Sequence, residues 1–150
     1  MWGCASTNPI YGGTGSGSLS KDNPTTTLLD GLHNAGFTTN DELTNLYSSY
    51  RAERPEVGMF KADWSLPEPT QDKYSESLLS GATSFGDTAV VTIARSGGEG
   101  FDLPRDVNAE TSNNPYFSYT NNSDEYADFE DGQAYLELTR PEKDMIELAK

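Results

Sequence analysis

A glutamate, Glu99, stands among glycines in the stretch RSGGEGFDLPRD, residues 95–106, directly after the most apolar run of the chain. A carboxylic acid held at such a place can give a proton to a departing oxygen and later take one from water. Glycines at 97, 98 and 100 permit backbone conformations closed to other residues and let a ligand approach closely. The residues alone leave two interpretations open: a solvated turn, or a carboxylate presented to a substrate.

The apolar run before this loop, residues 89–94, is rich in β-branched side chains. That pattern predicts a strand buried on both faces, as in a parallel sheet covered by helices. In open α/β sheets, functional groups gather on loops that leave the carboxyl ends of strands, and the Glu99 loop has that place. A parallel strand needs neighbours to receive its hydrogen bonds. We therefore expect the chain to be a piece of a larger α/β protein, cut at both ends.

Apolar residues recur at helical spacing in several stretches of the chain. The predicted helices cover residues 28–35, 39–50, 74–85 and 139–150. Gly36 stands where a left-handed cap would end the first helix. Thr39 with Glu42, and Thr139 with Glu142, form the capping-box pattern that begins the second and the last.

Two long stretches lack such periodicity. Prolines interrupt residues 51–71 and leave an extended connection, in which Met59, Phe60 and Trp64 are candidate anchors. Residues 95–133 are polar and too long for an ordinary loop in a compact domain.

The bulk composition restricts the classes of partner. A chain of 150 residues has the length of one domain, and its formal net charge is −14. Such a charge repels nucleic acid and anionic membranes, so a neutral ligand suits it better. No signal peptide is visible in the sequence, which favours a cytoplasmic location. Cys4 is the only cysteine and His33 the only histidine, so neither an internal disulfide, a cysteine metal cluster nor a serine–histidine–aspartate triad is indicated.

Two other segments suggest different chemistry. The YGGTGSG stretch, residues 11–17, misses both the G-x-G-x-x-G spacing and the lysine of a phosphate loop, and a flexible linker or a binding loop both remain open. Residues 121–131 carry five acids, yet an EF-hand register would put Ala127 and Phe129 at its first and third places. A solvated acidic loop is the favoured interpretation there. Neither a metal nor a cofactor is expected.

The stretch ARSGGEGFD, preceded far upstream by ASTNPIYGGTGSGSL and TLLDGLHNAGF, resembles the C-terminal α/β sandwich domain of glycoside hydrolase family 3, the β-glucosidase family. The late LELTRPEKDMIELAK is similar to the helix that follows the catalytic loop in that family. The likeness extends over nearly all of the chain. It implies a three-layer α/β/α sandwich with a mainly parallel sheet, incomplete in this fragment.

The resemblance also implies a function: two-step, retaining hydrolysis of a β-linked glucoside or short oligosaccharide. Glu99 matches the family's general acid/base, and the nucleophile is expected on a separate TIM-barrel domain that these residues do not include. Phe101 stands where family members often have an aromatic residue beside the aglycone, and Gly13 and Gly15 belong to a loop that borders the same pocket. One departure is the additional glycine in SGGEG, where many members have SGEG.

Two rival classes remain: a non-catalytic binding or structural module, and an acidic metal-binding protein. Under the glycosidase interpretation, the fragment alone is expected to be inactive, because nucleophile and sugar pocket belong to the barrel. Unpaired strand edges make a homo-oligomer a further expectation.

Overall fold

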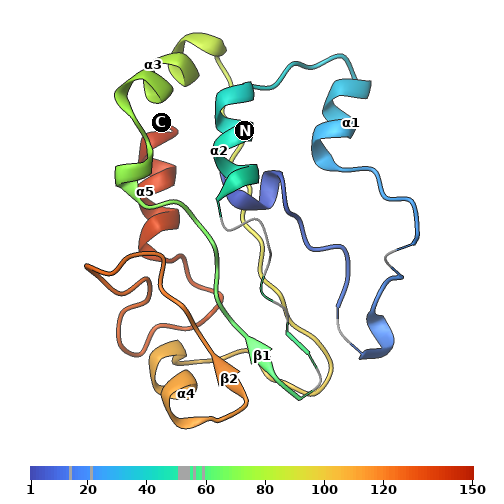
Figure 1. Cartoon of the computed structure of the whole chain (residues 1–150), viewed down its shortest axis with the longest axis vertical. Helices are drawn as coiled ribbons and strands as arrows, with labels where there is room; N and C mark the ends of the chain where they lie inside the picture. The colour runs from blue at the N-terminus through green and yellow to red at the C-terminus, as the bar shows by residue number, and fades with distance from the viewer. Residues whose placement is uncertain (14, 21, 51–54, 56, 59) are drawn as a thin grey trace.

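The computed structural model describes residues 1–13, 15–20, 22–50, 55, 57–58 and 60–150. Their α-helices are α1 (Leu28–Asn34), α2 (Asp41–Ser49), α3 (Glu76–Phe85), α4 (Val107–Asn113) and α5 (Arg140–Leu148). Single turns of 3₁₀ helix lie at η1 (Cys4–Ser6), η2 (Gly15–Gly17) and η3 (Gln71–Lys73). The strands are β1 (Ala62–Asp63) and β2 (Phe117–Ser118). Helices α2, α3 and α5 gather toward one end of an elongated molecule, and β1, β2 and α4 toward the other (Figure 1).

The two strands form a small parallel sheet. Ala62 pairs with Phe117 and Asp63 with Ser118. The ladder continues at both ends, because the Ala62 amide donates to the Tyr116 carbonyl at 2.8 Å and the Trp64 amide to the Ser118 carbonyl at 2.9 Å. Parallel pairing needs a crossover between its strands, and α3 lies within that crossover. The chain is thus a mixed α/β structure with a parallel sheet.

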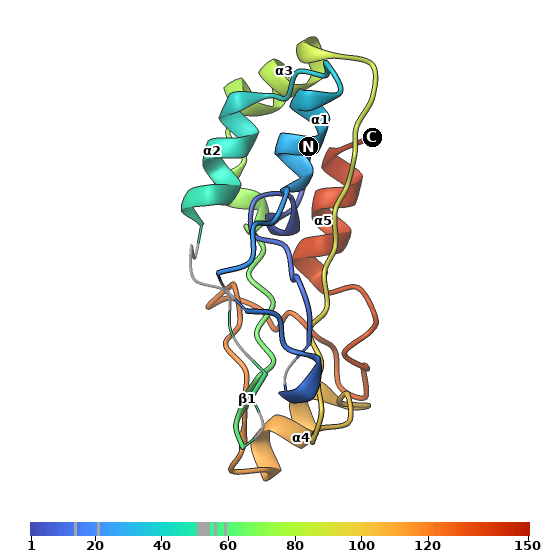
Figure 2. The same ribbon diagram turned by 90° about the vertical axis from the view of Figure 1, so that its right-hand side faces the viewer.

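The strand predicted at residues 89–94 does not form as a regular element, and the segment is not buried on both faces. It makes one parallel bridge, between Val91 and Trp2, in which the Trp2 amide donates to the Val90 carbonyl and the Thr92 amide to the Trp2 carbonyl, both at 2.9 Å. Val90 and Ile93 are each 42% exposed. In Figure 2 this segment runs along one edge of the molecule. The prediction of burial on both faces is wrong because, among the described residues, Trp2 alone forms a strand-like pair with it.

The first two predicted helices form, with one shifted boundary. Gly36 has φ 88°, the left-handed conformation predicted after α1. The N-cap of α2 is Asn40, whose side-chain oxygen accepts from the Leu43 amide at 2.9 Å. The prediction of Thr39 as the cap is wrong, because the Thr39 hydroxyl lies 2.9 Å from Nε2 of the exposed His33 instead.

The last helix confirms its capping box. The Thr139 hydroxyl accepts from the Glu142 amide, and the Glu142 carboxylate accepts from the Thr139 amide at 2.8 Å. The third helix begins later than predicted, after the N-cap Ser75. Tyr74 therefore lies outside α3, and its side chain is buried.

The two stretches without periodicity contain regular structure. Residues 51–71 include β1, and residues 95–133 include α4 and β2. Trp64 is fully buried, as an anchor should be, whereas Phe60 is 78% exposed and the prediction for it is wrong. Met59 lies outside the described residues.

Two groups of buried apolar side chains hold these elements together. The first packs α2, α3 and α5 around the N-terminal segment: Trp2, Cys4, Leu43, Tyr47, Tyr74, Leu78 and Met145. The second lies around the small sheet: Val57, Ala62, Trp64, Leu66, Val107, Phe129 and Tyr135. Both tryptophans thus pack in a core. Across the described ranges, no helix combines the length and the apolar character needed to cross a membrane.

The acidic stretch 121–131 is only partly solvated. Asp128 is 1% exposed, and its Oδ2 atom accepts from the Tyr119 hydroxyl and from the Asn122 side-chain amide, each at 2.8 Å. Burial and the neighbouring Asp128 carboxylate raise the pKa of Tyr119. The interpretation of this stretch as a wholly solvated loop is therefore wrong at Asp128, which serves as a buried hydrogen-bond acceptor.

Candidate active site

Glu99 lies at the tip of a tight turn. An antiparallel bridge joins Gly98 to Phe101, and Gly100 within the turn has φ 100°. That conformation is open to glycine and strained for most other residues. The turn leaves the Glu99 side chain exposed, so the carboxylate is presented at the surface of the chain.

The glycine loop at residues 12–17 touches this turn. A Cβ atom placed on Gly15 would lie 2.6 Å from Oε2 of Glu99 and 3.0 Å from its Cβ. One placed on Gly13 would lie 3.7 Å from the Gly97 carbonyl oxygen. Gly15 has φ 69°, so both its backbone conformation and its contact with Glu99 favour the absence of a side chain. The structure thus brings together Glu99, Gly13 and Gly15, three of the residues that the sequence singled out.

A cavity of about 680 Å³ opens beside this contact. Gly13 and Gly15 line it from the glycine loop, and Ser96 and Gly97 from the start of the Glu99 loop. Glu99 is not among its lining residues, but it contacts one of them, Gly15. The volume of the cavity falls within the range of about 300–1,000 Å³ that is usual for small-molecule sites.

Among the residues that the structure describes, the cavity wall carries no charge and combines polar groups with apolar surface. Asn23, Thr25 and Ser20 supply amide and hydroxyl groups, and Tyr11 and Leu19 supply apolar surface. Tyr11 and Leu19 are 40% and 57% exposed. Amides and hydroxyls pair with ligand hydroxyls, and an aromatic face packs on apolar ring surfaces. Such a wall suits a neutral, hydroxylated ligand.

Phe101, the remaining predicted site residue, lies elsewhere. Its ring is half-buried and packs edge-on against Phe117, with the ring centroids 5.2 Å apart. It joins the core around the small sheet and does not line the cavity beside Glu99. The stacking of Phe101 on an aglycone stays a prediction.

Tyr135 fastens both ends of the Glu99 loop. Its hydroxyl lies 3.3 Å from the Ser96 amide nitrogen and 3.2 Å from the Ser96 hydroxyl, and its own amide donates to the Pro104 carbonyl at 3.0 Å. The Tyr135 carbonyl accepts from Nε of Arg95 at 2.7 Å. Tyr135 is fully buried, so the loop is attached to the core at its beginning and at its end.

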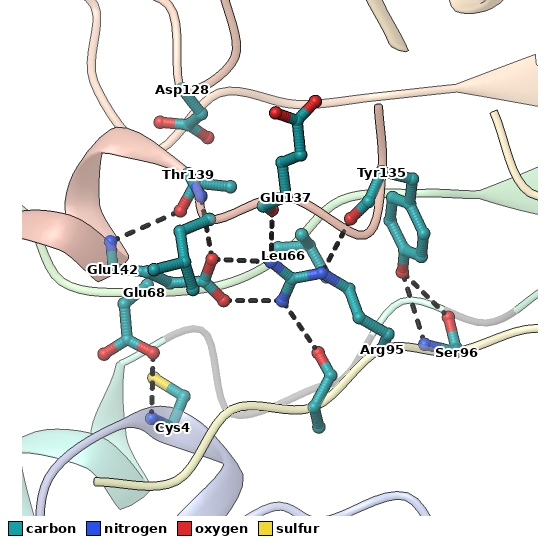
Figure 3. Close-up of polar contacts among 12 residues, drawn as sticks. Cys4, Leu66, Glu68, Arg95, Ser96, Asp128, Tyr135, Glu137, Thr139 and Glu142 are labelled. Carbon is teal, nitrogen blue, oxygen red and sulfur yellow. Dashed lines mark hydrogen bonds and ion pairs between the residues drawn. The ribbon is translucent and has the colours of Figure 1, made fainter. Parts of the chain in front are cut away.

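Arg95 forms a buried ion pair with Glu142. Nη1 and Nη2 of Arg95 donate to the two carboxylate oxygens of Glu142 at 2.6 and 2.7 Å (Figure 3). The two side chains are 12% and 4% exposed. This fork-to-fork geometry is the strongest form of such a pair. It ties the residue before the Glu99 loop to the first turn of α5.

Sequence reasoning did not assign roles to Arg95, Tyr135 or Glu142 in the site. Arg95 stood within the quoted stretch, and a basic residue beside a glycine-rich loop in a chain with 10 lysines and arginines against 24 acids was a usable signal. Glu142 was found only as a helix cap. Nothing local marks Tyr135, because its contacts are with residues far away in sequence.

No group of three histidine, cysteine, aspartate or glutamate side chains is placed to hold a metal ion within the described ranges. The site as described combines the exposed Glu99 carboxylate with a cavity whose described lining residues carry no charge.

A β-glucosidase of Ruminococcus albus is 34% identical to this chain over 90 residues. The match takes in 58% of the chain and 9% of the relative, so the chain spans less than a tenth of that protein. No family model and no solved structure matches the chain. The similarity indicates a relationship to a glycosidase.

Proposed function

We propose that residues 1–150 form part of the C-terminal α/β sandwich domain of a retaining β-glycosidase of glycoside hydrolase family 3. Glu99 is the general acid/base of that enzyme, and its substrate is a β-linked glucoside or a short oligosaccharide. A TIM-barrel domain outside these residues supplies the nucleophile and most of the sugar pocket. The three-layer sandwich with a mainly parallel sheet is likewise part of this proposal.

One observation carries the proposal: Glu99 contacts Gly15 beside the cavity. The two segments on which the family resemblance depends, the glycine loop and the SGGEG loop, therefore meet at one place. The described residues of the cavity wall carry no charge, which suits a sugar, and the similarity to a β-glucosidase points to the same substrate class. Val90 and Ile93 are exposed on the segment before the loop, as expected if elements outside these residues cover that face in the whole domain.

In the proposed reaction, the proton of the Glu99 carboxyl group is given up in the first step and regained in the second. Protonated Glu99 gives its proton to the glycosidic oxygen while the bond from that oxygen to the anomeric carbon breaks. The carboxylate of the barrel attacks the same carbon and forms a glycosyl ester. Water then attacks the anomeric carbon while the bond from that carbon to the barrel carboxylate breaks, and the water gives its proton to Glu99, which returns to its starting state. Two inversions retain the β configuration, and the two carboxyl groups must stand about 5–5.5 Å apart.

The test uses the chain joined to a TIM-barrel domain, as in the full-length enzyme that we propose. Glu99→Gln should lower kcat/KM on alkyl β-glucosides by about 10²–10⁴-fold, the usual contribution of general acid/base catalysis. Glu99→Gly should regain turnover of a dinitrophenyl β-glucoside when azide is added and should release the β-glucosyl azide. Azide replaces water as the nucleophile that releases the sugar, so this product identifies the lost group as the base.

A different result would favour the rival class. If Glu99→Gly keeps wild-type rates on every glucoside, or if azide changes nothing, Glu99 has no catalytic role and a non-catalytic binding or structural module is the better description. The chain without a barrel should not hydrolyse an aryl β-glucoside. Turnover by the isolated chain that Glu99→Gln abolishes would contradict the need for a barrel nucleophile.

A further inference from the structure

The Glu99 loop depends on distant residues for its position. Its own sequence is rich in glycine, which gives the backbone wide conformational freedom, and the carboxylate is exposed. General acid catalysis needs the donor within hydrogen-bond reach of the departing oxygen, and a displacement of 1 Å can cost about 10²-fold in rate. A loop of this composition must therefore be fixed from outside itself.

Arg95 attaches the beginning of the loop to distant residues. Its five N–H groups all have acceptors: the Tyr135 carbonyl for Nε, the Ala94 carbonyl and one Glu142 oxygen for Nη1, and the Glu137 carbonyl with the other Glu142 oxygen for Nη2. A guanidinium has five donors in a fixed plane, so this site uses every one. Figure 3 shows Arg95 between the Glu142 carboxylate and the carbonyl groups of residues 135 and 137.

The same segment also holds the far end of the loop. Tyr135 donates its amide to the Pro104 carbonyl at 3.0 Å and reaches Ser96 with its hydroxyl. Both ends of the loop from Ser96 to Pro104 are thus attached to residues 135–142. Arg95 adds the ion pair with Glu142 to these attachments. Lysine could not replace it, since an ammonium group cannot make the two-pronged contact with Glu142 and reach two carbonyls in one plane.

We propose that Arg95, paired with Glu142, is a positioning residue for Glu99. It touches no substrate and acts by holding the 96–104 loop on residues 135–142, so that the Glu99 carboxyl meets the departing oxygen. The inference rests on the proposed glycosidase function and adds the residues that make its acid/base effective.

A positioning role and a purely structural role predict different kinetics. If Arg95 only stabilises the fold, its loss reduces the fraction of active enzyme and lowers kcat/KM equally for every substrate. If Arg95 positions the acid, its loss matters most where the departing group needs a proton. Alkyl glucosides need it, and dinitrophenyl glucosides hardly do. The ratio of the two rates therefore separates the roles.

The experiment measures kcat/KM of Arg95→Met in the full-length enzyme on a series of β-glucosides with departing groups of increasing acidity. We expect a fall of about 10²-fold on the alkyl glucoside, as for a displaced catalytic group, and less than about 3-fold on the dinitrophenyl glucoside, where acid assistance contributes little. Arg140→Met is the matched control. Arg140 is an exposed arginine in α5, the helix that carries Glu142, and its guanidinium stacks on the Tyr126 ring at 4.0 Å. In Arg140→Met the ratio should stay at its wild-type value.

A second variant answers the case in which Arg95→Met does not fold, since that change leaves the buried Glu142 carboxylate without its ion-pair partner. Arg95→Met combined with Glu142→Gln removes both charges, and a glutamine oxygen can still accept from the Thr139 amide. The folded double variant should keep the selective loss on alkyl glucosides, because the attachments to residues 135 and 137 are missing.

The outcomes distinguish this inference from the function on which it rests. If Glu99→Gln is impaired and rescuable but both Arg95 variants lose activity equally on all glucosides, the positioning role is refuted and the glycosidase assignment stands. If Glu99→Gln is itself fully active, the proposed function fails and takes the positioning role with it.

Discussion

The contact between Gly15 and Glu99 is directly testable by giving Gly15 a side chain. In Gly15→Ala the new Cβ would lie 2.6 Å from Oε2 of Glu99 and 3.0 Å from its Cβ. The carboxylate can rotate away, but the Glu99 Cβ is fixed to its backbone. The glycine loop and the Glu99 turn must therefore move apart.

The expected loss has three parts. Alanine at φ 69° costs about 1–2 kcal/mol in the left-handed region. The steric conflict adds about 1–3 kcal/mol, the usual range for overpacking. The lower entropy of the unfolded alanine chain returns about 0.4–1 kcal/mol. We expect the free energy of unfolding to fall by about 2–3 kcal/mol, measured by urea denaturation with the fluorescence of the buried Trp2 and Trp64 as the signal.

Two other glycines separate these parts. Gly132 has φ 78° and open space where a Cβ would stand, so Gly132→Ala carries the backbone strain alone and should cost about 1 kcal/mol. Gly17 has open space and no left-handed conformation, so Gly17→Ala keeps only the entropy term and should raise stability by about 0.4–1 kcal/mol. If Gly15→Ala costs no more than Gly132→Ala, the two loops do not touch in solution.

A double-mutant cycle gives the sharpest form of the test. In a Glu99→Gly background the obstructing side chain is absent, so Gly15→Ala should then cost only its backbone strain. The coupling energy between the two sites should be about 1–2 kcal/mol, in the range found for residues in contact. A coupling energy near zero would refute the contact, and with it the observation that carries the proposed function.

Three further predictions follow from the described contacts. Asn40→Ala should cost about 1 kcal/mol of stability and Thr39→Ala much less, because the Asn40 side chain caps α2; a larger loss for Thr39→Ala would contradict that cap. Arg95→Met should cost about 3–5 kcal/mol by leaving the Glu142 carboxylate buried without its ion-pair partner, and adding Glu142→Gln should restore much of it; equal urea midpoints for the single and double variants would contradict the pair. Burial raises the pKa of three tyrosines: Tyr47, Tyr74 and Tyr119. The pKa of each is higher in the folded chain than in the unfolded one, where it is about 10. Their contribution to the free energy of unfolding is therefore complete below pH 10, and that free energy should decline above pH 10 by up to about 4 kcal/mol per pH unit. Urea midpoints that stay constant from about pH 9 to 11 would refute this.

The features that the sequence predicted well are those decided within a few residues. The capping box of Thr139 and Glu142 and the left-handed Gly36 depend on contacts inside one helical turn. The strand predicted at 89–94 is wrong as a regular element, since the stretch forms only an isolated bridge at Val91. Its burial was not predictable, because an apolar run indicates a buried strand only if other elements cover it, and Val90 and Ile93 are exposed.

Helix α4 shows why other elements were missed. Its sequence, VNAETSN, holds asparagine, threonine and serine, which compete with a helix through local hydrogen bonds. The helix forms because the Asp106 side chain caps it at 3.0 Å from the Ala109 amide and Val107 is fully buried. The cap was visible in the sequence, but the burial of Val107 comes from distant parts of the chain.

The candidate site likewise has features that the sequence indicates and contacts that only the fold reveals. Glu99 stood out by its place among glycines, and the family resemblance pointed to Gly13 and Gly15. The contact between Gly15 and Glu99, however, depends on folding together two loops that lie far apart in the chain. Phe101 was a candidate by resemblance alone: its ring packs on Phe117 and does not line the cavity, and its stacking on an aglycone stays a prediction.

Glu142 joins the local and the distant kinds of information in one side chain. Its Oε2 atom accepts from the Thr139 amide, which starts α5, and both oxygens bind Arg95, which precedes the Glu99 loop. Each bond orients the carboxylate for the other, so the beginning of the helix and the position of the loop are mechanically coupled. A helix cap needs only an acceptor, and glutamine serves there as well as glutamate. The negative charge of Glu142 is therefore explained by its ion pair with Arg95, the residue that attaches the 96–104 loop to residues 135–142.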